Sequence, residues 1–217
     1  MSISRPIKLV SVSFLTLFVS ISSIAGAAPI PGWQNAEQDS KDAPLIDPML
    51  LYNAGGLDGK VAVIGIPSMR TYRHIDVGVD LHEPVFSGTN AGNKNGSPDG
   101  KYLYVNDKGA NTIGIINLQT GMLERLISLP LPFGVHHIAL DDTGKFLYGS
   151  GEYSGKMSKT EISTGKTQVI DWGPAPSAPD YLDVDKKGRY VFSGNYYHST
   201  VGVFSTNPFK FISNSEA

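Results

Sequence analysis

The stretch "DGKYLYVN", residues 99–106, decides the fold, because close variants of it recur along the chain. The variants are "DGKVAVIG" at 58–65, "TGKFLYGS" at 143–150 and "KGRYVFSG" at 187–194. Their shared glycines are 41, 44 and 44 residues apart, at Gly59, Gly100, Gly144 and Gly188. In each copy the glycine allows the positive φ of a tight turn, and the alternating residues after it predict a strand.

A second alternating segment follows the phrase in three of the copies. These segments are "NTIGIINLQTG" at 111–121, "GKMSKTEISTG" at 155–165 and "STVGVFSTN" at 199–207. A repeat of about 40–50 residues with four strands per copy is typical of a β-propeller. The alternative is a β-sandwich with evenly spaced strands. No segment has a helical period, so we predict an all-β propeller with four-stranded blades of about 44 residues.

The number of copies raises a question about closure of the propeller. The chain holds about four copies, and the last stops soon after its second strand, in "NPFKFISNSEA". We interpret residues 51–217 as a partial propeller, with 28–50 as a flexible N-terminal arm. Open propellers leave strand edges unpaired. We therefore expect either a truncated propeller or one completed by a second chain or by homo-oligomerisation.

The first 27 residues are typical of a secretory signal peptide. Arg5 and Lys8 precede a short apolar run, and a small-residue motif predicts cleavage after Ala27. A membrane anchor is the alternative, but the run is shorter than the ~20 residues of a spanning helix. We expect a periplasmic protein that is free of the membrane after cleavage.

The composition restricts the kinds of metal ligand and binding partner that the chain could have. The chain has no cysteine, which excludes disulfides and thiolate metal ligands. The net charge is -2 without a basic stripe, which argues against a nucleic-acid partner. Nitrogen ligands for a borderline or soft metal such as copper would therefore be imidazoles.

Two of the five histidines are adjacent in "LPFGVHHIAL", a segment that we predict to be the innermost strand of its blade. His136 and His137 from this strand, and His82 from "VDLHEPVFS" one blade earlier, could converge near the propeller axis. The alternative is that these are ordinary polar residues of strands. Adjacent side chains also point to opposite faces of a strand, so a bulge would be needed for both His136 and His137 to face the axis.

Much of the chain resembles the N-terminal propeller of the nitrous oxide reductase family. The resemblance runs from about residue 50 to 207, is closest to the Sec-exported branch, and includes the YVTN-type propeller phrase. It rests on "GGLDGKVAVIGIPSMRTYRHI" (55–75), "VDLHEPVFSGTN", "GVHHIALDDTGKFLYGSGE" (134–152) and "DVDKKGRYVFSGNYYHS" (183–199). It implies a four-copper sulfide cluster on the propeller axis, held by seven histidines. That cluster reduces N2O with electrons from a cupredoxin domain.

The resemblance also assigns candidate ligands, with clear departures. The Asp-x-His-His motif of the family corresponds to Asp80-Leu81-His82-Glu83, and a Gly-Ile-His-Gly motif corresponds to residues 134–137. Glu83 and His137 therefore replace a histidine and a glycine. The other cluster histidines and the cupredoxin domain have no counterpart in this chain. The predicted metal ligands are His82 and His136, then Glu83 and His137, with Asp80 orienting an imidazole and Glu152 near the channel.

These departures favour a small mononuclear copper or zinc site over the four-copper cluster. We predict a nitrous oxide reductase-like periplasmic propeller that does not turn over N2O alone, and we assign no catalytic residue. One alternative is a non-enzymatic exported propeller of the YVTN type that binds a partner or acts as a scaffold. The other is a propeller of the haem d1 type, with His82 or His136 as the axial ligand.

Overall fold

The computed structural model describes residues 44–86, 100–130, 134–172 and 177–216. The expected signal peptide and most of the expected arm lie outside these residues. The described part is built from strands and one 3-10 turn. Their bounds are β1 Met49–Ala54, η2 Gly56–Asp58, β2 Lys60–Ile66, β3 Thr71–Asp76, β4 Leu81–Phe86, β5 Tyr102–Asp107, β6 Thr112–Asn117, β7 Met122–Ser128, β8 Val135–Leu140, β9 Phe146–Gly151, β10 Lys156–Glu161, β11 Thr167–Asp171, β12 Pro179–Val184, β13 Tyr190–Asn195, β14 Thr200–Thr206 and β15 Phe209–Glu216.

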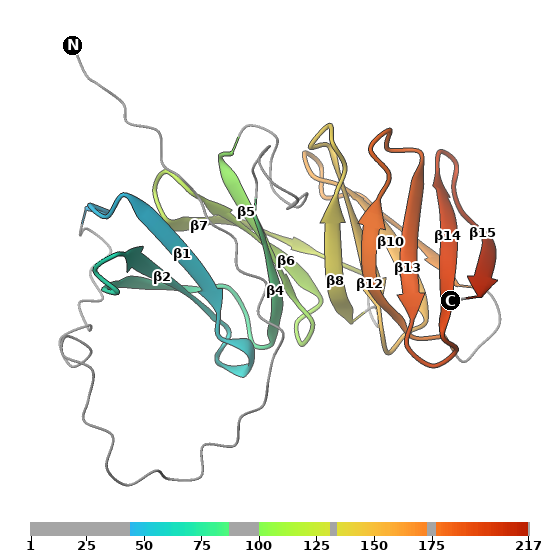
Figure 1. Ribbon diagram of the computed structural model, residues 1–217, viewed down its shortest axis with the longest axis horizontal. Coiled ribbons are helices and arrows are strands. Elements are labelled where there is room, and N and C mark those ends of the chain that lie inside the picture. The colour runs from blue at the N-terminus through green and yellow to red at the C-terminus, as the bar shows by residue number, and fades with distance from the viewer. Residues whose placement is uncertain (1–43, 87–99, 131–133, 173–176, 217) are drawn as a thin grey trace, which may run out of the picture. The chain divides into compact units, whose positions relative to one another are not determined.

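The strands form four sheets, each a meander of sequential neighbours (Figure 1). The first sheet has three strands in the order β1-β2-β3, and the other three each have four. Those three are β4-β5-β6-β7, β8-β9-β10-β11 and β12-β13-β14-β15. Pairing within the four-stranded sheets is antiparallel throughout. The predicted all-β propeller fold is therefore confirmed, and three of the four described sheets have the predicted four strands.

The glycines of the repeated phrase lie in the turns that the sequence predicted. All four have positive φ, at 66° for Gly59, 68° for Gly100, 68° for Gly144 and 63° for Gly188. L-residues with a side chain rarely adopt this conformation. The turns at Gly59, Gly144 and Gly188 close the hairpin between the first two strands of their sheets, and Gly100 lies two residues before β5.

The chain divides into two compact units. The first contains the described residues up to Asn53 together with Ala62–His74, and the second contains Ala54–Val61 and the chain from Ile75 onward. Within the first unit, the Asp47 carboxylate accepts hydrogen bonds from the backbone N–H and the hydroxyl of Ser68 and from the hydroxyl of Tyr72. These bonds tie the segment before β1 to β3 and to the turn before it.

The three blades of the second unit stack through apolar layers. One layer joins Tyr104, Ile113 and Ile115 to Ile138, Leu140 and Leu147 of the next blade. The next layer joins Tyr148, Met157 and Trp172 to Val184, Val191 and Phe204. Burial of such side chains contributes about 1.5–3 kcal/mol each.

The innermost strands meet where these blades stack. Strand β8 lies beside β4 on one side and beside β12 on the other, as Figure 1 shows for β8 and β12. The prediction that "LPFGVHHIAL" supplies an innermost strand is confirmed, since β8 is the first strand of its sheet. No helix in the described ranges is both long enough and apolar enough to cross a bilayer.

Candidate metal centre

All three innermost strands of the second unit carry a β-bulge at the same place. The register slips between Leu81 and Pro84 in β4, between Val135 and His137 in β8, and between Pro179 and Leu182 in β12. The partner positions at the bulges are 44 residues apart, at Asp107, Gly151 and Asn195. A bulge places two residues opposite one and re-aims the side chains beside it. Each innermost strand therefore directs polar side chains out of the regular alternation.

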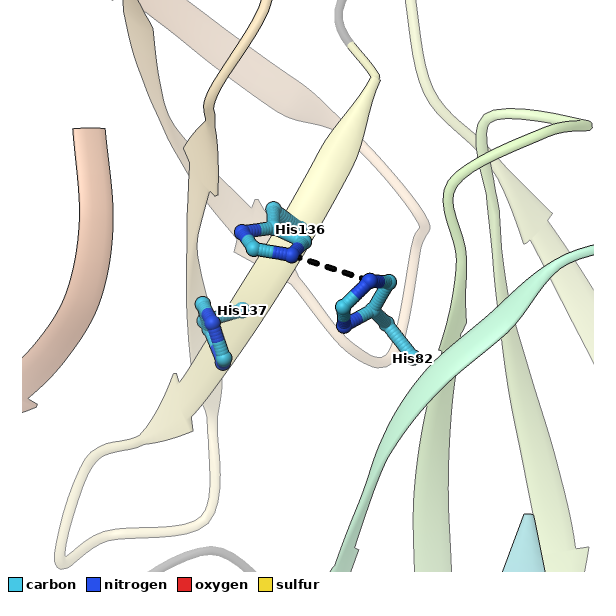
Figure 2. A group of neighbouring side chains, drawn as sticks. All are labelled: His82, His136 and His137. Carbon is cyan, nitrogen blue, oxygen red and sulfur yellow. Dashed lines mark hydrogen bonds between the residues drawn. The ribbon is translucent and has the colours of Figure 1, made fainter. Parts of the chain in front are cut away.

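The bulges bring three imidazoles together. His136 and His137 come from β8, and His82 comes from β4; Figure 2 shows the ring of His82 turned toward that of His136. The Nε2 atoms of His82 and His136 are 3.0 Å apart. The ring centroids of His136 and His137 are 4.2 Å apart. One ring nitrogen from each residue lies within 4.8 Å of the others, which is a spacing that could hold a metal ion.

A carboxylate from the third blade borders the same group. Asp180 Oδ1 lies 3.1 Å from His136 Nδ1 and 2.9 Å from His137 Nε2. Neither His136 Nδ1 nor Asp180 Oδ1 makes a hydrogen bond of good geometry within the described structure, although both atoms are buried. Groups of this kind cost free energy unless a proton, a water or an ion satisfies them.

A second carboxylate has its own cationic partner. Glu152 Oε2 lies 2.8 Å from Lys108 Nζ and 3.6 Å from His136 Nδ1. The Lys108 ammonium also lies 4.0 Å from the centre of the Tyr153 ring. Lys108 therefore neutralises Glu152, and the charge of Asp180 is left facing the imidazoles.

Burial favours the neutral form of His136. His136 is 9 % exposed and His137 is 5 % exposed. Burial, with the neighbouring imidazoles and Lys108, lowers the pKa of His136 to about 3. Partial desolvation of its ring, followed by the Lys108 charge, also lowers the pKa of His82, although the residue is exposed to solvent. His136 therefore has one unprotonated ring nitrogen at neutral pH.

Side chains of the second strands brace the bulges from behind. Asn106 on β5 donates hydrogen bonds to the carbonyl oxygens of Val135 and His136, at 3.1 and 2.6 Å. Asp107 accepts bonds from the backbone N–H groups of Val79 and Asp80, just before β4. These contacts fix where His82 and His136 leave their strands.

The structure brings together some of the predicted site residues. His82 and His136 meet as expected, and His137 joins them because β8 is bulged. The side chain of Glu83 lies outside the described residues. Asp80 donates its backbone N–H to Asp107 and acts on His82 only as a nearby negative charge.

Sequence reasoning missed Asp180. The signal was present, because Asp180 follows His136 by one repeat of 44 residues. The remaining histidines, His74 and His198, are exposed and lie outside the three-imidazole group.

Comparison with known proteins agrees with this description. Residues 117–210 match the family model "Lactonase, 7-bladed beta-propeller". Nitrous-oxide reductase of Stutzerimonas stutzeri is 26% identical over 165 residues, covering 57% of this chain and 25% of that protein. The enzyme of Pseudomonas fluorescens is 26% identical over 147 residues, covering 54% and 22%. The chain thus spans about a quarter of the length of the curated relatives it matches.

A solved structure shares the fold. Hydrazine synthase of Kuenenia stuttgartiensis superposes with a TM-score of 0.61 at 13% identity, covering 76% of this chain and 45% of that one. At this identity the match concerns the fold alone. The repeated sheets and the family match together identify this chain as a β-propeller, and its sequence is similar to that of nitrous-oxide reductase over about half of its length.

Proposed function

We propose that the chain is an exported, periplasmic propeller that binds a copper ion through His82, His136 and His137. The observation that carries this proposal is the approach of three imidazoles from two adjacent innermost strands to within 4.8 Å of one another. Copper is the metal suggested by the similarity to nitrous-oxide reductase. Export is suggested by the signal-like sequence of residues 1–27.

The donor set fits a single borderline metal ion. Neutral imidazoles bind copper and zinc, and the depressed pKa of His136 means that one of its ring nitrogens carries no proton near neutral pH. The unsatisfied His136 Nδ1 and Asp180 Oδ1 atoms mark a place where a cation would be stabilised. A bound copper ion would supply a redox-active centre at this position.

The same donors do not fit a four-copper sulfide cluster. The described part of the chain gathers three imidazoles, whereas that cluster in the resembled family requires seven. A hard carboxylate such as Asp180 is also poorly matched to a sulfide-bridged copper site. We therefore derive no N2O chemistry for this chain alone.

Within the centre, the protein's own groups have separable roles. The bulge of β8 positions His136 and His137. The exposed His82 forms the side of the metal centre that faces solvent. Lys108 forms an ion pair with Glu152 and so offsets the charge of a carboxylate that lies 3.6 Å from His136 Nδ1. Tyr181 stacks on His137 with ring centroids 4.1 Å apart and limits the rotation of that ring.

Calorimetric titration of the purified, metal-free chain with Cu2+ and Zn2+ tests the proposal. We expect one ion per chain, and a loss of affinity of at least about tenfold in His82→Ala and His136→Ala. The matched control is His198→Ala, because His198 is exposed and lies outside the centre. Binding that is absent, or that is equally strong in all variants, would contradict a metal centre at these residues. A Soret band after expression with haem would instead favour the haem alternative.

An exposed aromatic face supports a second proposal, that of a partner. Phe192 on β13 is 40% exposed, whereas Tyr148 and Tyr104, one and two repeats earlier, are each 2% exposed. Those two tyrosines are buried because the next blade covers them. We propose that a blade from a second copy of the chain covers Phe192. Light scattering after size exclusion should show an oligomer that Phe192→Lys dissociates; a monomeric wild-type chain would contradict it.

A further inference from the structure

The β-bulges of three successive blades place a polar residue at the same structural position in each blade. His82, His136 and Asp180 each follow the residue at which the register of their innermost strand slips, namely Leu81, Val135 and Pro179. Blades that stack side by side bring equivalent positions toward a common centre. Each blade of the second unit thus contributes one polar donor from the same structural position, and the third donor is a carboxylate.

We propose that Asp180 is itself a ligand of the centre, which therefore takes a divalent first-row metal ion through mixed nitrogen and oxygen donors. This inference rests on the proposed metal-binding function. It adds that Asp180 is the oxygen donor and that the bound ion is divalent. It distinguishes the centre from an all-imidazole site, which would also accept a monovalent copper ion.

The distances and the geometry of the Asp180 contacts suit a ligand of a shared ion. Its Oδ1 atom lies within 3.1 Å of one nitrogen from each of His136 and His137. Despite these distances, Oδ1 and His136 Nδ1 lack a well-oriented hydrogen bond in the described structure. An N–H pointing at Oδ1 would satisfy both atoms, so their close but misaligned approach fits two lone pairs directed at a shared cation.

Electrostatics favour a cation at the same place. The side chain of Asp180 is only 19% exposed, so its charge is poorly solvated. Among the described residues no lysine or arginine forms an ion pair with it, whereas Glu152 is paired with Lys108. A buried carboxylate without a cationic partner is strongly destabilising. A divalent ion between Asp180 and the imidazoles removes that cost.

The donor chemistry sets the class of ion. Carboxylate oxygen is a hard donor and imidazole nitrogen a borderline one, a combination that suits Zn2+ and Cu2+. Cu+ prefers soft sulfur donors and gains little from a carboxylate. The carboxylate therefore confers a preference for the divalent ions.

The test compares Zn2+, Cu2+ and Cu+ affinities of the purified chain with those of Asp180→Asn, an isosteric change that removes the charge. We expect Zn2+ and Cu2+ affinity to fall at least about tenfold, and Cu+ affinity to change less than about threefold. The matched control is Asp171→Asn on β11, which removes a carboxylate that is 77% exposed and pairs with Lys156 at the surface. That control should change each affinity less than about threefold.

A role for Asp180 only in orienting His136 and His137 would weaken all three ions alike, and unchanged affinities would exclude any role; both overturn this inference while leaving metal binding intact. If the wild-type chain binds none of the ions, the proposed function fails as well. Should Asp180→Asn not fold, infrared difference spectra of the wild-type chain labelled with 13C-aspartate decide the question. Ligation predicts a shift of a carboxylate stretching band on Zn2+ binding, and an unshifted spectrum refutes it.

Discussion

Replacement of Asp107 by alanine should destabilise the protein and loosen the His82 side of the centre. The Asp107 side chain is fully buried and accepts hydrogen bonds from the backbone N–H groups of Val79, Asp80, Gly109 and Ala110, at 2.9, 3.1, 3.0 and 3.0 Å. It therefore joins the segment that leads into β4 to the turn between β5 and β6. Alanine would leave these four donors without their acceptor.

The magnitude follows from the number of lost bonds. Each contributes about 1 kcal/mol net, so Asp107→Ala should lower the free energy of unfolding by about 4 kcal/mol. For a chain of this size that corresponds to a fall in Tm of roughly 8–16 °C. Asp107→Asn keeps one acceptor oxygen but turns an NH2 group toward a backbone N–H, so we expect about half the loss.

Urea unfolding followed by the fluorescence of the buried Trp172 measures this loss. The control is Asp171→Ala, because the Asp171 side chain is 77% exposed and pairs only with Lys156 at the surface. That change should cost less than about 0.5 kcal/mol. A loss below about 1 kcal/mol in Asp107→Ala would refute the view that this carboxylate holds the β4 segment. Metal affinity of the folded variant should also fall, because Asp80 lies two residues before His82.

Three further changes probe other parts of the structure. Gly202→Ala should cost at least about 1–3 kcal/mol in chemical unfolding, since its Cβ would lie 2.3 Å from the Trp172 ring, and a neutral result would contradict the tight packing of β14. Asn106→Ala should cost about 2–3 kcal/mol and weaken metal binding, because it leaves the carbonyl oxygens of Val135 and His136 unsatisfied; unchanged affinity would show that the bulge holds without it. Because the folded-state pKa of His136 is lowered to about 3, the metal-free protein should lose stability as pH falls from about 6.5 toward 3, and His136→Gln should reduce that loss in denaturation at several pH values. Parallel pH profiles for the two proteins would refute this assignment.

The repeated phrase made the fold predictable. The glycine turns and the alternation after them are local properties, and their 44-residue spacing reports the number of strands per blade. Gly100, Gly144 and Gly188 adopt the predicted conformation because few other residues tolerate it. The count of strands in the first sheet was not predictable in this way, since its phrase is offset by 41 residues rather than 44.

The candidate site was predictable only in part. The sequence indicated that His82 and His136 could meet, because both precede a repeat phrase in neighbouring blades. It also showed that His137 needed a bulge, but bulge formation depends on the pairing of β8 with β9 and on the bracing by Asn106 across the blade interface. Such contacts join residues about 30 positions apart and leave no local pattern. Asp180 was not predicted, because only its offset of 44 residues from His136 marks it in the sequence.

The single extra residue in β8 has a consequence for how this chain could be altered. Removing one residue at the slip would restore strict alternation, and His136 and His137 would then face opposite sides of the sheet. The blade itself could remain folded, but one of the two imidazoles would move from the metal centre into the layer between two sheets. Deleting one residue at this bulge would therefore abolish the proposed metal binding without changing any ligand side chain.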